Sequence, residues 1–209
     1  MTLRLNGSTS GYVEIDAPDE AGSNTLVLPN GNGTNGQVLS TNGSGALSFV
    51  DRPRQVLSTS VASTSGTEID FTEIPSWVKR VTVMFSAVST SAGTSLIIRL
   101  GDSGGIETAD YESACSNLSA SISSNASVVG LLLAVYGSAD AAFSGSITIS
   151  NFSGNQWVST GVLGRDDTNA SHASGGRKEL SGTLDRIRIT TINGTHTFDA
   201  GAINIMYEG

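Results

Sequence analysis

The feature that most constrains this fold is the strict alternation of apolar and polar side chains over residues 81–85, Val-Thr-Val-Met-Phe. Val81, Val83 and Phe85 point to one face and the two intervening residues to the other, which is the period of a half-buried β-strand. A second strong strand follows at residues 95–100, after the polar loop 86–94. We expect these two strands, joined by that loop, to form the nucleus of one sheet of a sandwich.

Segments of the same kind recur through the rest of the chain, and no segment favours a helix. Residues 109–127 contain too much Ser and Asn for one, because both side chains compete for backbone hydrogen bonds. The strands predicted after residue 52 are 55–61, 67–71, 78–88, 95–100, 128–136, 143–152, 156–163, 183–192 and 202–207. About nine strands joined by polar turns predict an all-β fold, an antiparallel jelly-roll-like sandwich.

Residues 1–51 have a different character and predict a small Gly-rich β module. Short runs at 3–5, 11–16, 25–28, 37–40 and 46–50 alternate with Asn-Gly turns, the strongest local hairpin signal. So few large side chains cannot build an independent core, so we expect copies of the module or a partner protein to stabilise it. Arg52-Pro53-Arg54 marks the junction, which gives an attachment module (1–51) and a β-sandwich domain (52–209).

Composition excludes several classes of function. The net charge is −8 with only 11 Lys and Arg, which argues against nucleic-acid binding, because that requires phosphate neutralisation. The longest apolar run, near 128–136, is too short to cross a membrane, and no apolar segment of a secretory signal follows Met1. A single cysteine, Cys115, excludes an internal disulfide framework. These features fit a protein made in a cytoplasm, and such a protein can work outside a cell if it leaves on a particle.

Two groups of sequence motifs resemble proteins of bacteriophage particles. The first resembles a module recurrent in phage tail fibres, especially those of cyanophages: residues 11–15, 17–18, 21–29, 33–39 and 48–50. The second is similar to C-terminal β-domains of phage fibre and spike proteins: residues 74–80, 100–108 and 180–186. The resemblance implies a homotrimeric virion protein that binds a host surface glycan or protein without catalysis. Its N-terminal module would attach it to other virion proteins, such as the tail hub, baseplate or capsid. Because the chain has no long shaft, a capsid decoration or head-fibre protein is the alternative.

Motifs that spell catalytic or cofactor sites have simpler explanations here. Residues 101–105, Gly-Asp-Ser-Gly-Gly, match the string around a trypsin-like nucleophile, but both histidines, His172 and His196, follow it instead of preceding it. The match to G-x-G-x-x-G at residues 31–36 precedes a strand and not the helix that a dinucleotide needs. We expect both segments to be turns. The acidic groups lack calcium-loop spacing, and two histidines form no zinc pattern, so we expect no cofactor, no metal and no enzyme. A depolymerase remains the weakest alternative, because such phage spikes usually need a long β-helix.

The residues expected to contact a ligand cluster around one polar loop. Residues 164–176 carry Arg165, Asp166, Asn169 and His172, and loops on a rigid sandwich are where binding usually occurs. Trp157 is open to two interpretations, as a core residue or as a platform for a sugar ring. Trp77 follows Pro75 and precedes the strongest strand, so we expect it to cover the core. The predicted glycan contacts are therefore Trp157, Arg165, Asp166, Asn169 and His172.

Overall fold

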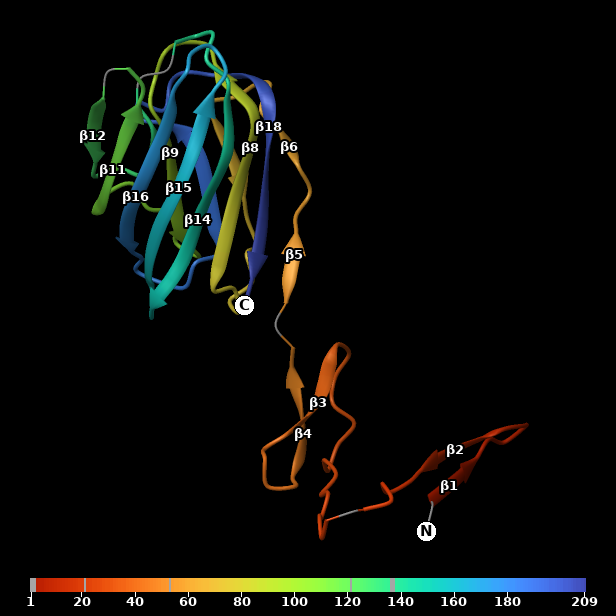
Figure 1. Ribbon diagram of the computed structural model, residues 1–209. Helices are drawn as coiled ribbons and strands as arrows, with labels where there is room; N and C mark the ends of the chain where they lie inside the picture. The colour runs from red at the N-terminus through yellow and green to blue at the C-terminus, as the bar shows by residue number, and fades with distance from the viewer. Residues whose placement is uncertain (1–2, 21, 53, 121, 136–137) are drawn as a thin grey trace. The chain divides into compact units, whose positions relative to one another are not determined.

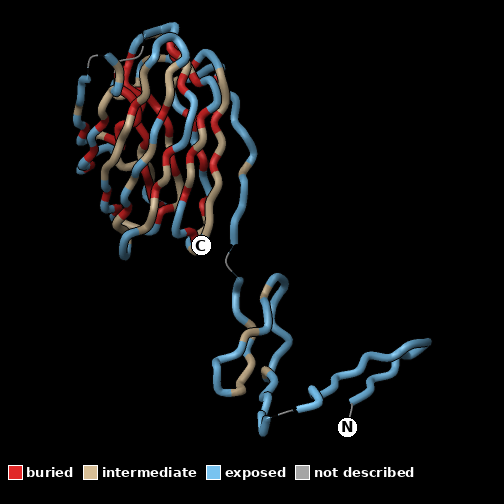
Figure 2. Tube along the Cα trace, in the orientation of Figure 1, coloured by how far each residue is buried: buried red, intermediate tan, exposed pale blue. Residues whose placement is uncertain are grey.

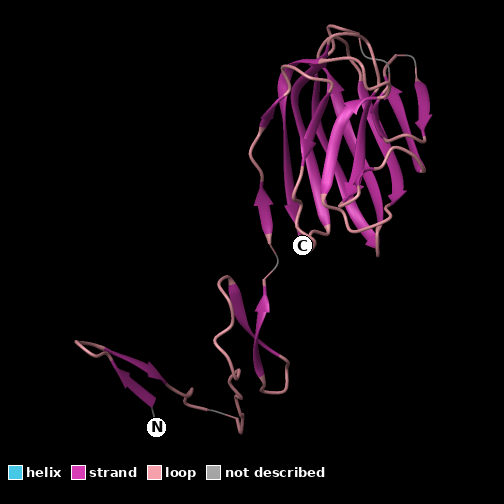
Figure 3. Ribbon diagram, turned by 180° about the vertical axis from the view of Figure 1, so that it is seen from behind, coloured by secondary structure: helices cyan, strands magenta, loops and turns pink. Residues whose placement is uncertain are grey.

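The computed structural model describes residues 3–20, 22–52, 54–120, 122–135 and 138–209. These residues form 18 strands and no helix, which confirms the all-β prediction (Figure 3). None of their elements is therefore an apolar helix that spans a membrane. The chain divides into two compact units, Met1–Arg52 and Pro53–Gly209. Pro53, at the predicted junction, lies outside the described residues.

The first unit consists of two separate antiparallel hairpins. They are β1 (Leu3–Asn6) with β2 (Tyr12–Ile15), and β3 (Gln37–Thr41) with β4 (Leu47–Asp51). Segment 25–28, predicted as a strand, makes only an isolated parallel bridge between Val27 and Ala46. None of the described residues of this unit is buried (Figure 2). A two-stranded sheet without a covered face has marginal stability in water.

The second unit is a sandwich of two antiparallel sheets (Figure 1). The larger sheet has nine strands in the order β12-β11-β16-β15-β14-β8-β18-β5, with β6 also paired to β18. Its strands are β5 (Gln55–Leu57), β6 (Val61–Ala62), β8 (Arg80–Thr90), β11 (Tyr111–Leu118), β12 (Ser123–Ser127), β14 (Phe143–Ser153), β15 (Gln156–Arg165), β16 (Ser171–Glu179) and β18 (Phe198–Glu208). The smaller sheet has five strands in the order β10-β9-β17-β7, with β13 also paired to β9. Its strands are β7 (Glu68–Phe71), β9 (Leu96–Asp102), β10 (Gly105–Ile106), β13 (Leu131–Ala134) and β17 (Arg186–Thr191).

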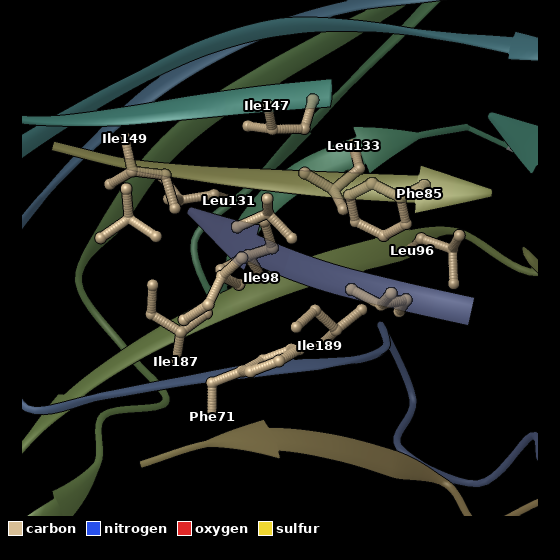
Figure 4. Close-up of a cluster of buried hydrophobic side chains, with 14 of the residues drawn as sticks. Phe71, Phe85, Leu96, Ile98, Leu131, Leu133, Ile147, Ile149, Ile187 and Ile189 are labelled. Carbon is tan, nitrogen blue, oxygen red and sulfur yellow. The ribbon is translucent and has the colours of Figure 1, made fainter. Parts of the chain in front are cut away.

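The core lies between the facing surfaces of the two sheets. The larger sheet contributes buried side chains such as Phe85, Ile147 and Ile149, and the smaller sheet contributes Ile98 and Ile189 (Figure 4). Val81, Val83 and Phe85 are all buried, as their alternation predicts. Trp77 is half-buried against this cluster, with its ring 5.8 Å from that of Tyr207, so the prediction that it covers the core is confirmed.

The structure corrects the prediction that residues 81–85 and 95–100 belong to one sheet. The first segment lies in β8 of the larger sheet and the second in β9 of the smaller sheet. Both strands turn apolar side chains inward. Their sequence pattern is therefore the same whether they lie in one sheet or in opposite sheets. The connection begins only at Ser91, because β8 continues to Thr90. It crosses between the layers, which in sandwiches lie about 10 Å apart.

Three strands carry no readable apolar alternation and were not predicted. β11 and β12 occupy residues expected to be irregular, and β16 begins inside the predicted loop 164–176. The inward residues of β11 include Ser113, whose Oγ accepts a hydrogen bond from the Leu132 amide at 2.7 Å. Those of β16 include His172 and Lys178, both buried. Because polar side chains occupy the inner face of these strands, a hydrophobicity pattern cannot reveal them.

A line of irregularities crosses three neighbouring strands of the larger sheet. Ala87 of β8, Gly145 of β14 and Gly201 of β18 have φ angles of 51°, 142° and 89°. The β14–β8 and β18–β8 pairings shift register beside these residues. A Cβ added to Gly201 would lie 2.3 Å from the Ala87 carbonyl oxygen, so this close approach requires glycine. Bulges of this kind bend strands locally.

We expect the substitution Gly201→Ala to lower the free energy of unfolding by about 2 kcal/mol, through a strained φ and a backbone clash. Gly194→Ala is the matched control, because Gly194 also has a positive φ of 67° but no atom lies within 4 Å of its added Cβ. Urea denaturation of both variants measures the difference. Equal losses would mean that the close approach to Ala87 carries no cost.

Candidate functional site

The candidate site lies at the end of the sandwich where the β15–β16 hairpin turns through residues 166–170. The turn closes with a hydrogen bond from the Arg165 amide to the Ala170 carbonyl at 3.1 Å. Beside it runs loop 138–142, which leads into β14. We call residues 138–142 and 165–170 together the tip. The tip lies at the opposite end of the sandwich from the pairing between β5 and the last residues of β18.

Two aspartates of the tip bind the neighbouring loop. The Ala142 amide donates to Asp166 Oδ1 at 2.8 Å, and the Asp166 amide donates to the Ala142 carbonyl at 3.2 Å. Asp167 accepts two hydrogen bonds from the Arg165 guanidinium, at 2.9 and 2.6 Å, and a third from Ser138 Oγ at 2.7 Å. The bonds from Arg165 and then Ser138 outweigh desolvation and lower the pKa of Asp167. The carboxylates therefore act as fasteners of loop 138–142.

The structure separates the five predicted ligand contacts into two groups. Asp166 and Asn169 are exposed at the tip, and Arg165 lies beside them with its side chain only 10% exposed. Its guanidinium sits over the Phe143 ring at 6.0 Å. Trp157 is 4% exposed and belongs to the main core, and His172 is completely buried. Both are therefore wrong as surface contacts, because inward positions of β15 and β16 present no face to a ligand.

His172 lies in the interior next to the tip and contacts residues on both sides of loop 138–142. Its Nδ1 accepts a hydrogen bond from the Val135 amide at 3.3 Å, and its ring meets that of Phe143 edge-on at 5.5 Å. Burial is the largest effect that lowers the pKa of His172; Arg165 lowers it further, and Asp167 opposes both. The neutral form is therefore favoured in the folded state, and stability from this residue falls as the pH drops below its ordinary pKa near 6.5.

We expect Asp167→Asn to loosen loop 138–142 without unfolding the sandwich, because it removes the charge that holds Arg165 and Ser138. Hydrogen exchange should show faster exchange of the Ala142 amide, with little change in core strands such as β14. Asn169→Ala, at an exposed position of the same turn, is the control and should leave Ala142 unaffected. Unchanged exchange in the Asp167 variant would contradict a fastening role.

The protease-like string lies at the opposite end of the unit and forms a turn, as predicted. Asp102 pairs with Gly105 where β9 turns into β10, and Ser103 and Gly104 are the two residues of the turn. The Gly104 amide donates to Asp102 Oδ1 at 2.8 Å. Ser103 is exposed, and His172 lies at the tip end beside Val135. His172 therefore lies at the far end of the unit from Ser103 and cannot act as its base.

Behind that turn, a cluster of polar groups links the two sheets: Asp102 and Lys178 are buried, Glu107 is half-buried and Ser181 is exposed. Ser181 Oγ lies 2.8 Å from Asp102 Oδ2 and 2.9 Å from Glu107 Oε1, and the Ser181 amide donates to the same Glu107 oxygen at 2.8 Å. Lys178 Nζ forms an ion pair with Glu107 Oε2 at 2.5 Å and lies 5.2 Å from the centre of the Tyr111 ring. Tyr111 in turn bonds the β9 backbone at Leu100. Each group pairs with another, so the cluster fastens the two sheets together.

Two further concave surfaces were not predicted from the sequence. One, near the start of β5, is lined by Arg54, Gln55, Lys79, Arg80, Ser150, Asn151, Glu208 and Gly209. The other is a shallow hollow on the outer face of the larger sheet, over Gly175 and Gly176, bordered by Val158 and the Glu112–Arg177 ion pair. The lining residues come from distant positions in the chain, so spacing gives no signal for either. No group of three or more His, Cys, Asp or Glu in the described part of the chain is arranged to hold a metal.

Comparison with known proteins does not assign the chain to a family. No protein-family model, curated protein or solved structure matches the chain.

Proposed function

We propose that this chain is a structural protein of a bacteriophage particle, a tail fibre or spike that binds the host surface without catalysis. The observation that carries the proposal is the contrast between its two units. The second buries a full core of its own, whereas the first leaves its apolar side chains exposed. This contrast is what a displayed domain with an assembly-dependent attachment module requires. The motif resemblance to phage fibre modules supports the same assignment.

The β1–β2 hairpin gives the attachment module a defined contact face. Its register places Leu3 opposite Ile15 and Leu5 opposite Val13, so these four side chains share one face. They are between 55% and 65% exposed. The other face carries Arg4 paired with Glu14 and stacked on Tyr12. We infer that the apolar face meets the same face of two further copies, as the fibre resemblance implies, while the module binds the tail hub, baseplate or capsid.

The sandwich domain presents the tip, where Asp166, Thr168 and Asn169 are exposed. Short polar side chains suit weak hydrogen-bonded contacts with a surface glycan or protein, and three copies multiply such contacts into useful avidity. We propose that the sandwich is jelly-roll-like, and the repeated crossing of the chain between the two sheets supports this. In this proposal the protein is located on the virion.

Self-association tests the module. Leu5→Glu places a charge on the apolar face and is expected to convert a trimer into monomers in sedimentation velocity, because burying an unpaired carboxylate is costly. Glu14→Gln, on the opposite face of the same hairpin, is the control and should remain trimeric. A monomeric parent chain, or a trimeric Leu5 variant, would overturn the proposed contact face.

Adsorption tests the function itself. The purified chain should bind susceptible cells and block infection without releasing reducing sugar ends from their polysaccharide. Sugar release would contradict the non-enzymatic proposal. The alternative is a capsid decoration or head-fibre protein, which the exposed module fits equally. Imaging this chain on intact virions separates the two, because a decoration protein lies on the head in far higher copy number than a tail appendage.

A further inference from the structure

Two buried polar atoms of the sandwich lack a hydrogen-bond partner among the described residues: Nε2 of His172 and Oδ1 of Asn117. Their residues are directly opposite each other, Asn117 in β11 and His172 in β16. Directly opposed residues of an antiparallel pair project to the same face, with Cβ atoms about 4.5–5.5 Å apart. The two unpaired atoms thus belong to neighbouring side chains on one face of the sheet. An unpaired buried polar group is costly, so two of them side by side require an explanation.

The hydrogen bonding of His172 settles which partner fits. Nδ1 accepts a hydrogen bond from the Val135 amide, so it carries a lone pair, and in a neutral imidazole the proton then resides on Nε2. Nε2–H is therefore a donor, whereas Asn117 Oδ1 is an acceptor. A group that accepts a hydrogen bond from Nε2–H and donates one to Oδ1 satisfies both atoms.

The same chemistry argues against a metal ion at this place. Nε2 has no lone pair to offer while it holds the proton, and a metal needs deprotonated ligands. Cys115, two residues from Asn117 in the same strand, is not a thiolate either. Its Sγ–H donates to the Leu133 carbonyl at 3.3 Å, and burial raises the pKa of the thiol to about 11. The donor set therefore suits a neutral ligand with both hydrogen-bonding capacities.

We propose that a water molecule is bound inside the sandwich between His172 and Asn117, accepting from Nε2–H and donating to Oδ1. Buried waters typically satisfy otherwise unpaired polar groups in this way. Apolar residues lie next to the two side chains: Phe143 packs against the imidazole, and Cys115 and Val135 belong to a buried cluster. The water links β11 to β16, and through His172 Nδ1 it is coupled to Val135, just before the tip loop.

Nuclear magnetic resonance of the intact chain tests the site directly. The His172 Nε2–H proton should be visible, slow to exchange with solvent, and should show a cross-relaxation peak to a long-lived water. A His172 ring protonated on Nδ1 instead, or a visible Nε2–H with no water contact, would overturn the proposal. So would a high-resolution crystal structure in which the Asn117 amide reaches His172 directly.

Substitutions provide an independent test. Asn117→Leu removes the acceptor and His172→Phe removes the donor, and each leaves the other polar atom unpaired. The double variant removes both and fills the space with apolar groups. His172→Phe also removes the acceptor of the Val135 amide, a cost that the double variant shares. We therefore expect the double variant to lose less stability than the sum of the two single losses, and to lose the long-lived water. Additive losses in the double variant would contradict a shared water. If His172→Phe does not fold, Asn117→Leu must still lose the water peak for the proposal to stand.

Discussion

Replacing Trp157 with alanine is expected to lower the free energy of unfolding by about 3–5 kcal/mol, the range for a large aromatic side chain removed from a packed core. Trp157 is 4% exposed and belongs to the main core cluster. It lies in β15 opposite Asn151 of β14 and Lys178 of β16, so its removal opens a cavity bordered by three strands. Urea denaturation of the purified chain gives the measurement.

The neighbouring residue supplies the matched control. Val158 points to the outer face of the same strand and is 37% exposed, so Val158→Ala should change stability by less than about 1 kcal/mol. A small loss in the Trp157 variant together with impaired binding to cells would restore the sugar-platform interpretation. A large loss of stability supports the core role.

How far the sequence could predict this molecule depends on where its polar residues point. Apolar side chains alternate inward over residues 81–85 of β8 and 147–149 of β14, and this alternation predicts both strands. β11 and β16 place Ser113, His172 and Lys178 inward. The groups that hydrogen-bond or form ion pairs with these side chains come from segments that are distant in the sequence. The pattern of apolar and polar residues along the sequence therefore does not reveal those partners. For the same reason the expected loop 164–176 proved to be half strand.

The predicted ligand residues show the same limit. Asp166 and Asn169 are predicted as contacts because they belong to a long polar loop of mixed charge, and the structure places both at an exposed turn. The prediction for Trp157 and His172 rests on the chemistry of their side chains, and that chemistry does not reveal which face of the strand each residue occupies. The fastening roles of Asp166 and Asp167 depend on loop 138–142, which is distant in the sequence and adjacent in space.

Substituting Lys178 with methionine is expected to cost about 3–5 kcal/mol, as large as the loss of the core tryptophan, although Lys178 is a charged residue. Its side chain is 4% exposed and lies between Tyr111 and Trp157, its partners on the two adjacent strands. Its Nζ pairs with Glu107, whose side chain is 21% exposed. Methionine fills the space of the stem but leaves the Glu107 carboxylate largely desolvated without its cation. The adjacent Arg177→Met is the control, because its ion pair with Glu112 is well exposed, with side chains 50% and 68% exposed, and should matter little.

The pH dependence distinguishes an unpaired carboxylate from a simple packing defect. Burial by itself would raise the pKa of Glu107, but the bonds from Lys178 and Ser181 together lower it below its ordinary value of 4.5. In the parent chain this residue therefore stabilises the fold above that value, and the contribution is lost as the pH falls through the lowered pKa. Without Lys178 the pKa of Glu107 should rise, so that protonation of the buried acid relieves the variant as the pH falls. The stability difference between parent and Lys178→Met should consequently shrink from pH 7 to pH 4 in urea titrations. A difference that stays constant over this range would assign the loss to packing and refute the buried ion pair.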